Sequence, residues 1–185
     1  MPCECASFTL KGMKSLPSAR VWMAAFAALG WFAAAYLLYT YLTGGPIACG
    51  PTSGCDVVRA SRYAYVGPIP QPLLGLVFYT MMLGLLIYRS VAQVWHQRLF
   101  WATRALVIVA FLESIALFLL QWLDIRAFCF WCLLSGAAST GMFVAGWFDR
   151  AERTGEGQSR DLRGYAAVML VLALVGTPLF LALIS

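Results

Sequence analysis

Five long apolar stretches, separated by short polar segments, make up most of this chain. They run from about Val21 to Thr43, Pro72 to Tyr88, Ala105 to Leu123, Phe128 to Phe148 and Tyr165 to Ile184. Each is close to the roughly 20 residues that a helix needs to cross the hydrocarbon core of a bilayer. No water is present there to bind open backbone groups, so each stretch must be helical. The pattern predicts an all-α integral membrane protein with five spans.

The composition agrees with a membrane protein, because 62% of the residues are apolar and only 11% are charged. A soluble domain carries about 25% charged residues. The formal net charge of +5 does not indicate a protein that binds nucleic acid, because the basic residues are scattered through short loops. We therefore interpret them as signals for orientation.

These basic residues predict which side of the membrane each loop occupies. Cytoplasmic loops carry the excess of Lys and Arg. The five-span pattern therefore places the N-terminus in the cytoplasm, and the loop 44–71 and the turn before Cys129 outside. The count is ten basic residues on one side (Lys11, Lys14, Arg20, Arg89, Arg98, Arg104, Arg150, Arg153, Arg160, Arg163) and three on the other (Arg59, Arg62, Arg126).

The expected organisation has four parts. A cytoplasmic tail, 1–20, contains Cys3 and Cys5, which we interpret as free thiols because no His lies near them and the compartment is reducing. A four-helix unit, 21–148, includes the exterior loop 44–71. A cytoplasmic linker, 149–164, leads to the fifth span, 165–185. The first span is much longer than the apolar region of a signal peptide, so it is expected to be retained.

The fourth stretch begins with a C-x-x-C pair, Cys129 and Cys132. Thiols at this spacing lie on one face of a helix and can form a disulfide. Cys129 would lie near the helix N-terminus, where the helix dipole favours a thiolate, and Cys132 one turn deeper and drier. Protein thiols would then reach the outer sulfur. Rings of the kind that gather at a membrane surface surround the pair: Trp122, Phe128, Phe130 and Trp131.

The exterior loop holds a second pair, Cys49 and Cys55, across a Gly- and Pro-rich turn. Such a pair can close a disulfide in an oxidising compartment. A structural staple is one interpretation, although a loop this short restricts the unfolded chain little. Residues 56–65 can form a short amphipathic helix on the membrane surface, which would shield the C-x-x-C from water.

Two further polar residues stand out. His96 is the one histidine of the chain and falls in the expected loop between Arg89 and Arg104, where we interpret it as a solvated residue. Glu113 lies near the middle of the third span. An ionisable residue at that depth is a hypothesis for function, and a protonated carboxyl bonded inside the bundle explains it equally well. Its role is left open.

Taken together, the two cysteine pairs and the residues between them resemble the vitamin K epoxide reductase family, in particular bacterial members that form protein disulfides. The resemblance covers about Val21 to Trp147 and is specific, because both pairs and their order among four helices agree. The matching residues are Cys49, Cys55-Asp56-Val57, Ser61-Arg62-Tyr63-Ala64, Gly67-Pro68-Ile69-Pro70, Gly75, Tyr79 and Phe128-Cys129-Phe130-Trp131-Cys132.

The resemblance implies a four-helix bundle around a quinone, either ubiquinone or menaquinone, in the inner membrane of a bacterium. By position, Cys49 would meet a separate thioredoxin-fold partner, Cys55 would exchange with Cys129, and Cys132 would face the quinone. It also implies polar or aromatic contacts to the quinone from Ser61, Gln71, Phe128 and Trp131. At Gly136, vertebrate relatives carry a tyrosine that contacts the vitamin, so this departure favours quinone reduction over epoxide reduction.

Three other functions compete with disulfide formation driven by quinone. One is reduction of vitamin K itself, as quinone or epoxide. A second is transport of soft metal ions through paired cysteines, which needs a path of thiols across the bilayer; after Cys132 the fourth stretch has none. The third is a structural membrane protein with an incidental disulfide. No metal site is expected.

Overall fold

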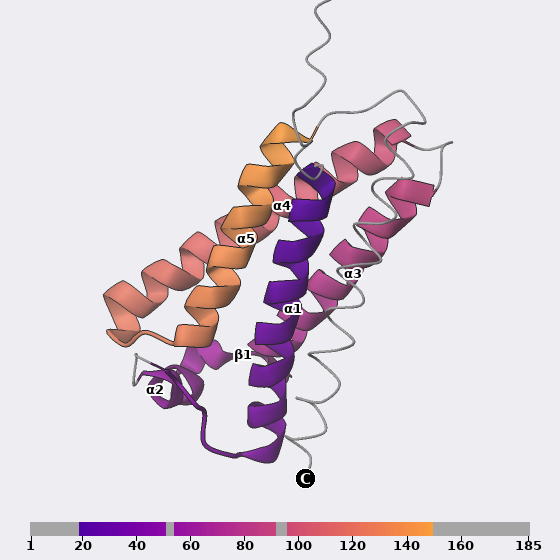
Figure 1. Ribbon diagram of the computed structural model, residues 1–185. Coiled ribbons are helices and arrows are strands. Elements are labelled where there is room, and N and C mark those ends of the chain that lie inside the picture. Colours follow the sequence, from indigo (N-terminus) through magenta and orange to yellow (C-terminus); the bar gives the residue numbers. More distant parts are fainter. Residues whose placement is uncertain (1–18, 51–53, 92–95, 150–185) are drawn as a thin grey trace, which may run out of the picture.

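The computed structural model describes residues 19–50, 54–91 and 96–149, and within them four long helices form a bundle (Figure 1). These are α1 (Ala19–Thr43), α3 (Gln71–Val91), α4 (His96–Leu120) and α5 (Phe130–Phe148). Each is long and apolar enough to cross a membrane. The prediction of a four-helix membrane bundle is thus confirmed. The fifth span, most of the tail and almost all of the linker lie outside the described residues.

Small side chains let α1 pack closely against both α3 and α5. Ala27 and Ala34 are buried, and a Cβ on Gly30 would come within 2.2 Å of the Tyr79 ring on α3. Tyr79 continues the contact to α5, because its hydroxyl lies 2.9 Å from the Ser135 carbonyl oxygen. Small residues spaced three and four apart, at Ala27, Gly30 and Ala34, therefore allow this close helix packing.

One end of the bundle is closed by buried ions, and we call it the charged end. Asp149 follows α5 and pairs with Arg20 of α1 at 3.4 Å and with Arg89 of α3 at 2.9 Å. All three side chains are at most 10% exposed. Arg20 and Arg89, which the sequence analysis assigns to short loops, lie instead in α1 and α3. With Asp149, the first residue of the expected linker, they neutralise one another inside the bundle.

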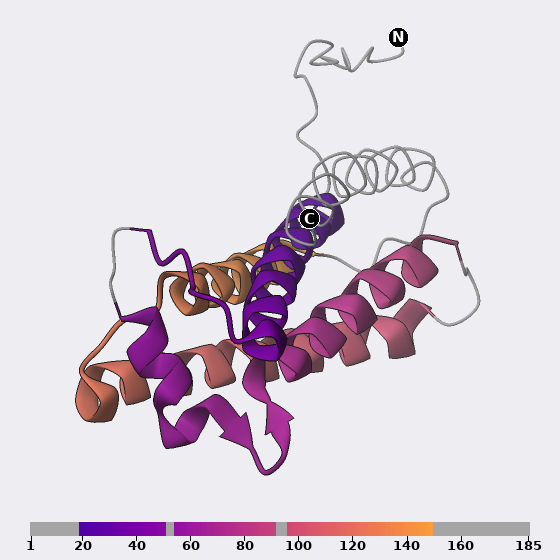
Figure 2. The same cartoon turned by 90° about the horizontal axis from the view of Figure 1, so that it is seen from below.

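The opposite end carries the cysteines, and the segments 44–50 and 54–70 cover it; we call them the cap (Figure 2). The cap contains α2 (Cys55–Ala60), the 3₁₀ turn η1 (Arg62–Ala64) and a two-stranded antiparallel hairpin, β1 (Tyr65–Val66) and β2 (Ile69–Pro70). Gly44 starts it with φ 68°, a left-handed conformation that ends α1 while its N–H bonds the Thr40 carbonyl.

Several predicted boundaries need correction. The expected loop 89–104 is mostly helical, since α3 continues to Val91 and α4 begins at His96. Arg104, at the end of that expected loop, lies over the rings of Phe100 and Trp147. The predicted helix 56–65 is broken at Ser61, whose backbone is extended and whose hydroxyl bonds the Val58 carbonyl.

Candidate active site

Two pairs of cysteines meet beneath the cap. Cys49 and Cys55 form the predicted disulfide, while Cys129 and Cys132 are free thiols. Cys55 and Cys129 are 1% and 2% exposed and belong to one apolar cluster, against which Cys49 and Cys132 also pack. The fold therefore brings together two thiol pairs that are about 80 residues apart in the sequence.

Two glycines explain how the cap approaches the C-x-x-C so closely. A Cβ on Gly54, the residue before Cys55, would lie 2.7 Å from the carbonyl oxygen of Phe128, the residue before Cys129. Gly50, the residue after Cys49, has φ 59° and lies against the ring of Phe130. Gly50 and Gly54, the neighbours of the two loop cysteines, thus contact Phe130 and Phe128, the neighbours of Cys129. The two cysteine pairs therefore face each other.

Cys129 is the residue that caps the N-terminus of α5, directly before its first turn. Its sulfur accepts a hydrogen bond from the Cys132 N–H at 3.4 Å. The Cys132 thiol also donates to this sulfur and, with the backbone N–H groups of the first turn, lowers the pKa of Cys129 below its ordinary value. Cys129 is therefore poised to be a thiolate, as its place at a helix start predicts.

Gln121 supports Cys129 at the start of α5, a role that sequence reasoning missed. It lies in the π-helical turn η2 (Gln121–Ile125) that ends α4, is 4% exposed, and accepts the Cys129 N–H at 2.8 Å through its side-chain oxygen. A glutamine inside an apolar span, eight residues before Cys129, is the signal that could have found it. Gln121 thus holds the backbone of the redox pair in place.

Trp131 holds the segment of the cap that precedes Cys49. Its indole N–H donates to the Ala48 carbonyl at 2.8 Å, and the Ala48 N–H in turn donates to the Tyr36 hydroxyl at 2.9 Å. The rings of Trp131 and Tyr36 lie 4.3 Å apart. The residue before Cys49 is therefore bonded to both α1 and α5, which positions the loop disulfide over the bundle.

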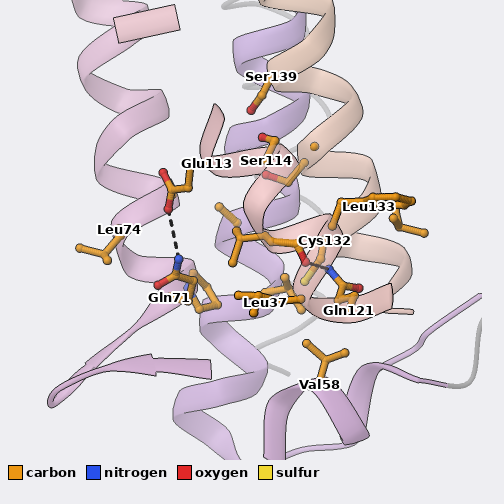
Figure 3. A pocket seen from close by; sticks show the side chains of 18 of the residues that line it. Leu37, Val58, Gln71, Leu74, Glu113, Ser114, Gln121, Cys132, Leu133 and Ser139 are labelled. Atoms are coloured by element: carbon orange, nitrogen blue, oxygen red, sulfur yellow. Dashed lines mark hydrogen bonds between the residues drawn. The ribbon is translucent and has the colours of Figure 1, made fainter. Parts of the chain in front are cut away.

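A cavity of about 370 Å³ lies between the helices below the cap and reaches Cys132 (Figure 3). Its walls are mostly apolar, from α1, α3, α4 and α5, and Val58 and Ser61 of the cap close it on one side. Cys132 is half-buried because its side chain faces this space, whereas Cys129 is shielded by the cap. The expectation that protein thiols reach Cys129 directly does not agree with its 2% exposure.

A few polar groups face the cavity. Gln71, the first residue of α3, donates from its side-chain nitrogen to the Glu113 carboxyl at 3.1 Å, and its own side-chain oxygen is buried without a partner in the described structure. Gln121 and the Ser61 hydroxyl lie along the same cavity. These groups form a small set of hydrogen-bonding sites in an apolar space, the usual make-up of a site for a flat organic ligand.

The expected ligand contacts are divided between two places. Ser61 and Gln71 line the cavity together with Cys132, whereas Phe128 and Trp131 are not among its lining residues. Phe128 packs instead against Phe118 and Trp122 near the end of α4, with ring centroids 5.9 and 6.2 Å away. Neither Phe128 nor Trp131 therefore takes the expected place in the wall of the cavity.

The family model described as the Vitamin K epoxide reductase family matches residues 21–147. The chain belongs to this family. The match spans the four helices and both cysteine pairs, so the resemblance proposed from the motifs is confirmed. Membership of the vitamin K epoxide reductase family makes the protein a membrane thiol oxidoreductase, and the Cys49–Cys55 disulfide beside a free C-x-x-C agrees with that chemistry.

A quinone, which the family implies, fits the residues present. The cavity is apolar and offers a donor and an unpaired acceptor on the Gln71 amide, together with a thiol from Cys132. The unpaired Gln71 oxygen can accept a hydroxyl of the reduced form, and the amide nitrogen can donate to a carbonyl of the oxidised form. Gln71, Ser61 and the apolar walls would hold the ring.

Proposed function

We propose that this protein oxidises a thioredoxin-fold partner outside the cytoplasm and passes the electrons through its two cysteine pairs to a quinone, so that exported proteins acquire disulfides. The observation that supports this best is the position of the two pairs. The Cys49–Cys55 disulfide and the thiols of Cys129 and Cys132 lie in one buried cluster, and Cys132 lines an apolar cavity. A path for electrons from the loop pair through the membrane pair to a ligand in the cavity is therefore short.

The proposed reaction begins when a partner thiolate attacks Cys49. Cys49 is half-buried, whereas Cys55 is 1% exposed, so the attack breaks the loop disulfide with Cys55 as the leaving sulfur. A second partner thiol releases Cys49, and the partner leaves as a disulfide. The loop pair then holds two electrons as two thiols.

In the next step Cys55 attacks Cys129 of an oxidised C-x-x-C and Cys132 leaves. Cys49 then attacks Cys55, re-forming the loop disulfide and releasing Cys129. Because the pKa of Cys129 is lowered, Cys129 is a good leaving group in this second exchange. A bound quinone would accept the two electrons and two protons that Cys129 and Cys132 lose when their disulfide re-forms.

The central test is a coupled assay with purified protein in detergent. A reduced thioredoxin-fold protein is the electron donor, a short-chain ubiquinone or menaquinone is the acceptor, and the loss of quinone absorbance is measured. We expect turnover that is abolished in Cys132→Ser and in Cys55→Ser. Reduction of quinone that continues in both variants would contradict the proposal.

Trapped intermediates test the order of the cysteines. With an oxidised partner present, Cys55→Ala should accumulate a mixed disulfide between Cys49 and the partner, because the Cys49 thiolate attacks the partner disulfide and Cys55 is no longer there to release the partner. The double variant Cys49→Ala/Cys132→Ala, treated with the thiol oxidant diamide, should instead form an internal Cys55–Cys129 bond, visible in peptides mapped without reduction. A partner attached to Cys129 while Cys49 stays free would mean that the loop pair is only a staple.

The same variants separate the competing functions. A soft-metal transporter would require cysteines for metal-dependent growth rather than for quinone turnover, and the described residues bring no three His, Cys, Asp or Glu side chains together as a metal site. Vitamin K epoxide as an acceptor can be tested beside the plain quinone. Gly136 lines the cavity with no polar side chain, so we expect the epoxide to be the poorer acceptor.

A further inference from the structure

Glu113 places a carboxyl group in the wall of the cavity, and the electron transfer proposed above gives this group no role. It lies near the centre of the 27-residue span Leu99–Ile125 and lines the cavity. Among the described lining residues, the other polar side chains are hydroxyls, amides and the Cys132 thiol. An ionisable group at this depth is costly to keep in a membrane, so it calls for a function.

The partner of Glu113 locates it relative to the redox pair. Its carboxyl accepts the hydrogen bond from Gln71 at 3.1 Å, and Gln71 begins α3 directly after the hairpin of the cap. Gln71 therefore reaches this mid-span carboxyl from the cysteine end of the bundle. Figure 3 shows Glu113 and Gln71 bonded to each other, with Cys132 and Gln121 lining another part of the same cavity.

Quinone reduction in this mostly apolar cavity requires a proton source. A quinone oxygen gains negative charge as electrons arrive, and a proton donor within hydrogen-bond reach removes that charge. The Gln71 amide can orient such an oxygen but does not give up a proton under ordinary conditions. Among the cavity groups, a carboxyl bonded to that amide is the one best suited to give and recover a proton.

We propose that Glu113 is a catalytic residue, which donates a proton to the quinone oxygen held at Gln71. This deepens the function proposed above and rests on it. The balance is that two thiols and one quinone become one disulfide and one hydroquinone. Cys129 and Cys132 lose two electrons and two protons as their S–S bond forms, and the quinone gains both. Glu113 delivers one proton and recovers another from those that the thiols release, so it is unchanged after each turnover.

A purely structural role makes a different prediction. If Glu113 only ties α4 to α3, then Glu113→Gln should behave as the parent, because its side-chain oxygen still accepts the Gln71 hydrogen bond. If Glu113 carries a proton, Glu113→Gln retains the contact and loses the chemistry. Glu113→Asp keeps an acid on a shorter side chain and should be partly active.

The experiment measures quinone reduction in the full chain for Glu113→Gln, Glu113→Asp and a control, Asp56→Asn. Asp56 is a carboxylate of the cap whose side chain is 60% exposed and lies outside the cavity. For Glu113→Gln we expect kcat to fall about 100-fold, the usual contribution of a general acid, with KM little changed. Asp56→Asn should have the parental kcat.

Two further readouts do not depend on turnover. Quenching of tryptophan fluorescence by a short-chain quinone should give the same Kd for Glu113→Gln and the parent. Exchange between the reduced partner and the two cysteine pairs, followed by mass spectrometry without quinone, should also be unchanged. In addition, the rate of quinone reduction by Glu113→Ala should rise at least tenfold when formate, a small acid, is added.

These outcomes separate the inference from the function on which it rests. Parental protein that fails to reduce quinone overturns both. Parental protein that reduces quinone, with Glu113→Gln at the parental rate, overturns the role of Glu113 alone. A third outcome is that Glu113→Gln binds quinone more weakly or exchanges dithiols more slowly, with no rescue of Glu113→Ala by formate. That result would mean that Glu113 has a structural role, and it would overturn the proposal.

Discussion

The two ends of the bundle bury polar groups in different ways. At the charged end, Asp149 is held between Arg20 and Arg89, ions that are nearly excluded from solvent. At the cysteine end, the contacts next to the thiols are made by neutral groups, the Trp131 indole and the Gln121 amide, and the charged groups Arg59 and Arg62 bind further out in the cap. A cavity of about 370 Å³ lies beside this second end. Buried ions thus join the helices at one end, and neutral hydrogen bonds surround the sulfur atoms at the other.

The difference reflects what each end must do. Removing one member of a buried ion pair leaves an uncompensated charge, so the charged end has one stable arrangement. A neutral hydrogen bond contributes only about 1 kcal/mol, so groups at the cysteine end can exchange partners at low cost. Thiol exchange requires sulfur atoms to change their bonding partners, and the cap, which carries Cys49 and Cys55, must move with them. The bundle therefore combines a fixed end with an adjustable one.

The largest effect is expected when the charged end is broken. Asp149→Asn leaves the buried Arg89 without its counter-ion, and we expect the free energy of unfolding to fall by about 3 to 5 kcal/mol. Thermal unfolding in detergent, followed by tryptophan fluorescence, measures this. The control is Asp124→Asn, which breaks the solvent-exposed pair with Arg62 and should leave the unfolding temperature unchanged. Equal unfolding temperatures for both variants would contradict the comparison.

Crowding the contact between the cap and the C-x-x-C should have the next largest effect. Gly54→Ala puts a methyl group 2.7 Å from the Phe128 carbonyl, so the cap must move, at a cost of about 1 to 3 kcal/mol. We expect slower exchange between Cys55 and Cys129, measured by trapping thiols at intervals after the partner is added. Gly45→Ala is the matched control in the same loop, since its nearest neighbour would be 3.5 Å away. Equal exchange rates for the two variants would refute the close approach.

Arg59 joins the cap to α1, and its loss should have a smaller effect. Its guanidinium donates to the Gly45 carbonyl at 2.7 Å and to the Thr40 carbonyl at 3.3 Å. Arg59→Met should lower the free energy of unfolding by about 1.5 kcal/mol, because a hydrogen bond from a charged donor to a carbonyl at the end of α1 is lost. Denaturation of the purified protein measures it. No change would mean that solvent replaces these bonds fully.

The smallest effect is expected at Trp131. Trp131→Phe removes one neutral hydrogen bond to Ala48 and keeps a ring against Tyr36, so we expect a loss of about 1 kcal/mol. The Cys49–Cys55 disulfide should then be reduced severalfold faster by dithiothreitol. Trp122→Phe is the control, because that side chain is 60% exposed. If the two variants are reduced equally fast, the Trp131 bond does not hold the loop.

Much of the architecture could be predicted from local patterns. The four described spans follow from apolar length, the loop disulfide from two cysteines across a short turn, and the packing of α1 from its small residues. These features depend on neighbours in sequence, where helix length and turn chemistry apply directly. The thiolate character of Cys129 also follows from its place at a helix start.

The groups that make the ends different needed the tertiary structure. Arg20 and Asp149 are 129 residues apart in the chain and meet only because α1 and α5 lie side by side. Gln121 and Glu113 read as isolated polar residues in an apolar span until the backbone of Cys129 and the amide of Gln71 are placed against them. Local sequence determined which segments cross the membrane, because burial in lipid leaves the backbone one solution. Which polar groups pair inside the bundle was decided by how the helices pack, since each buried group must find its partner across the fold.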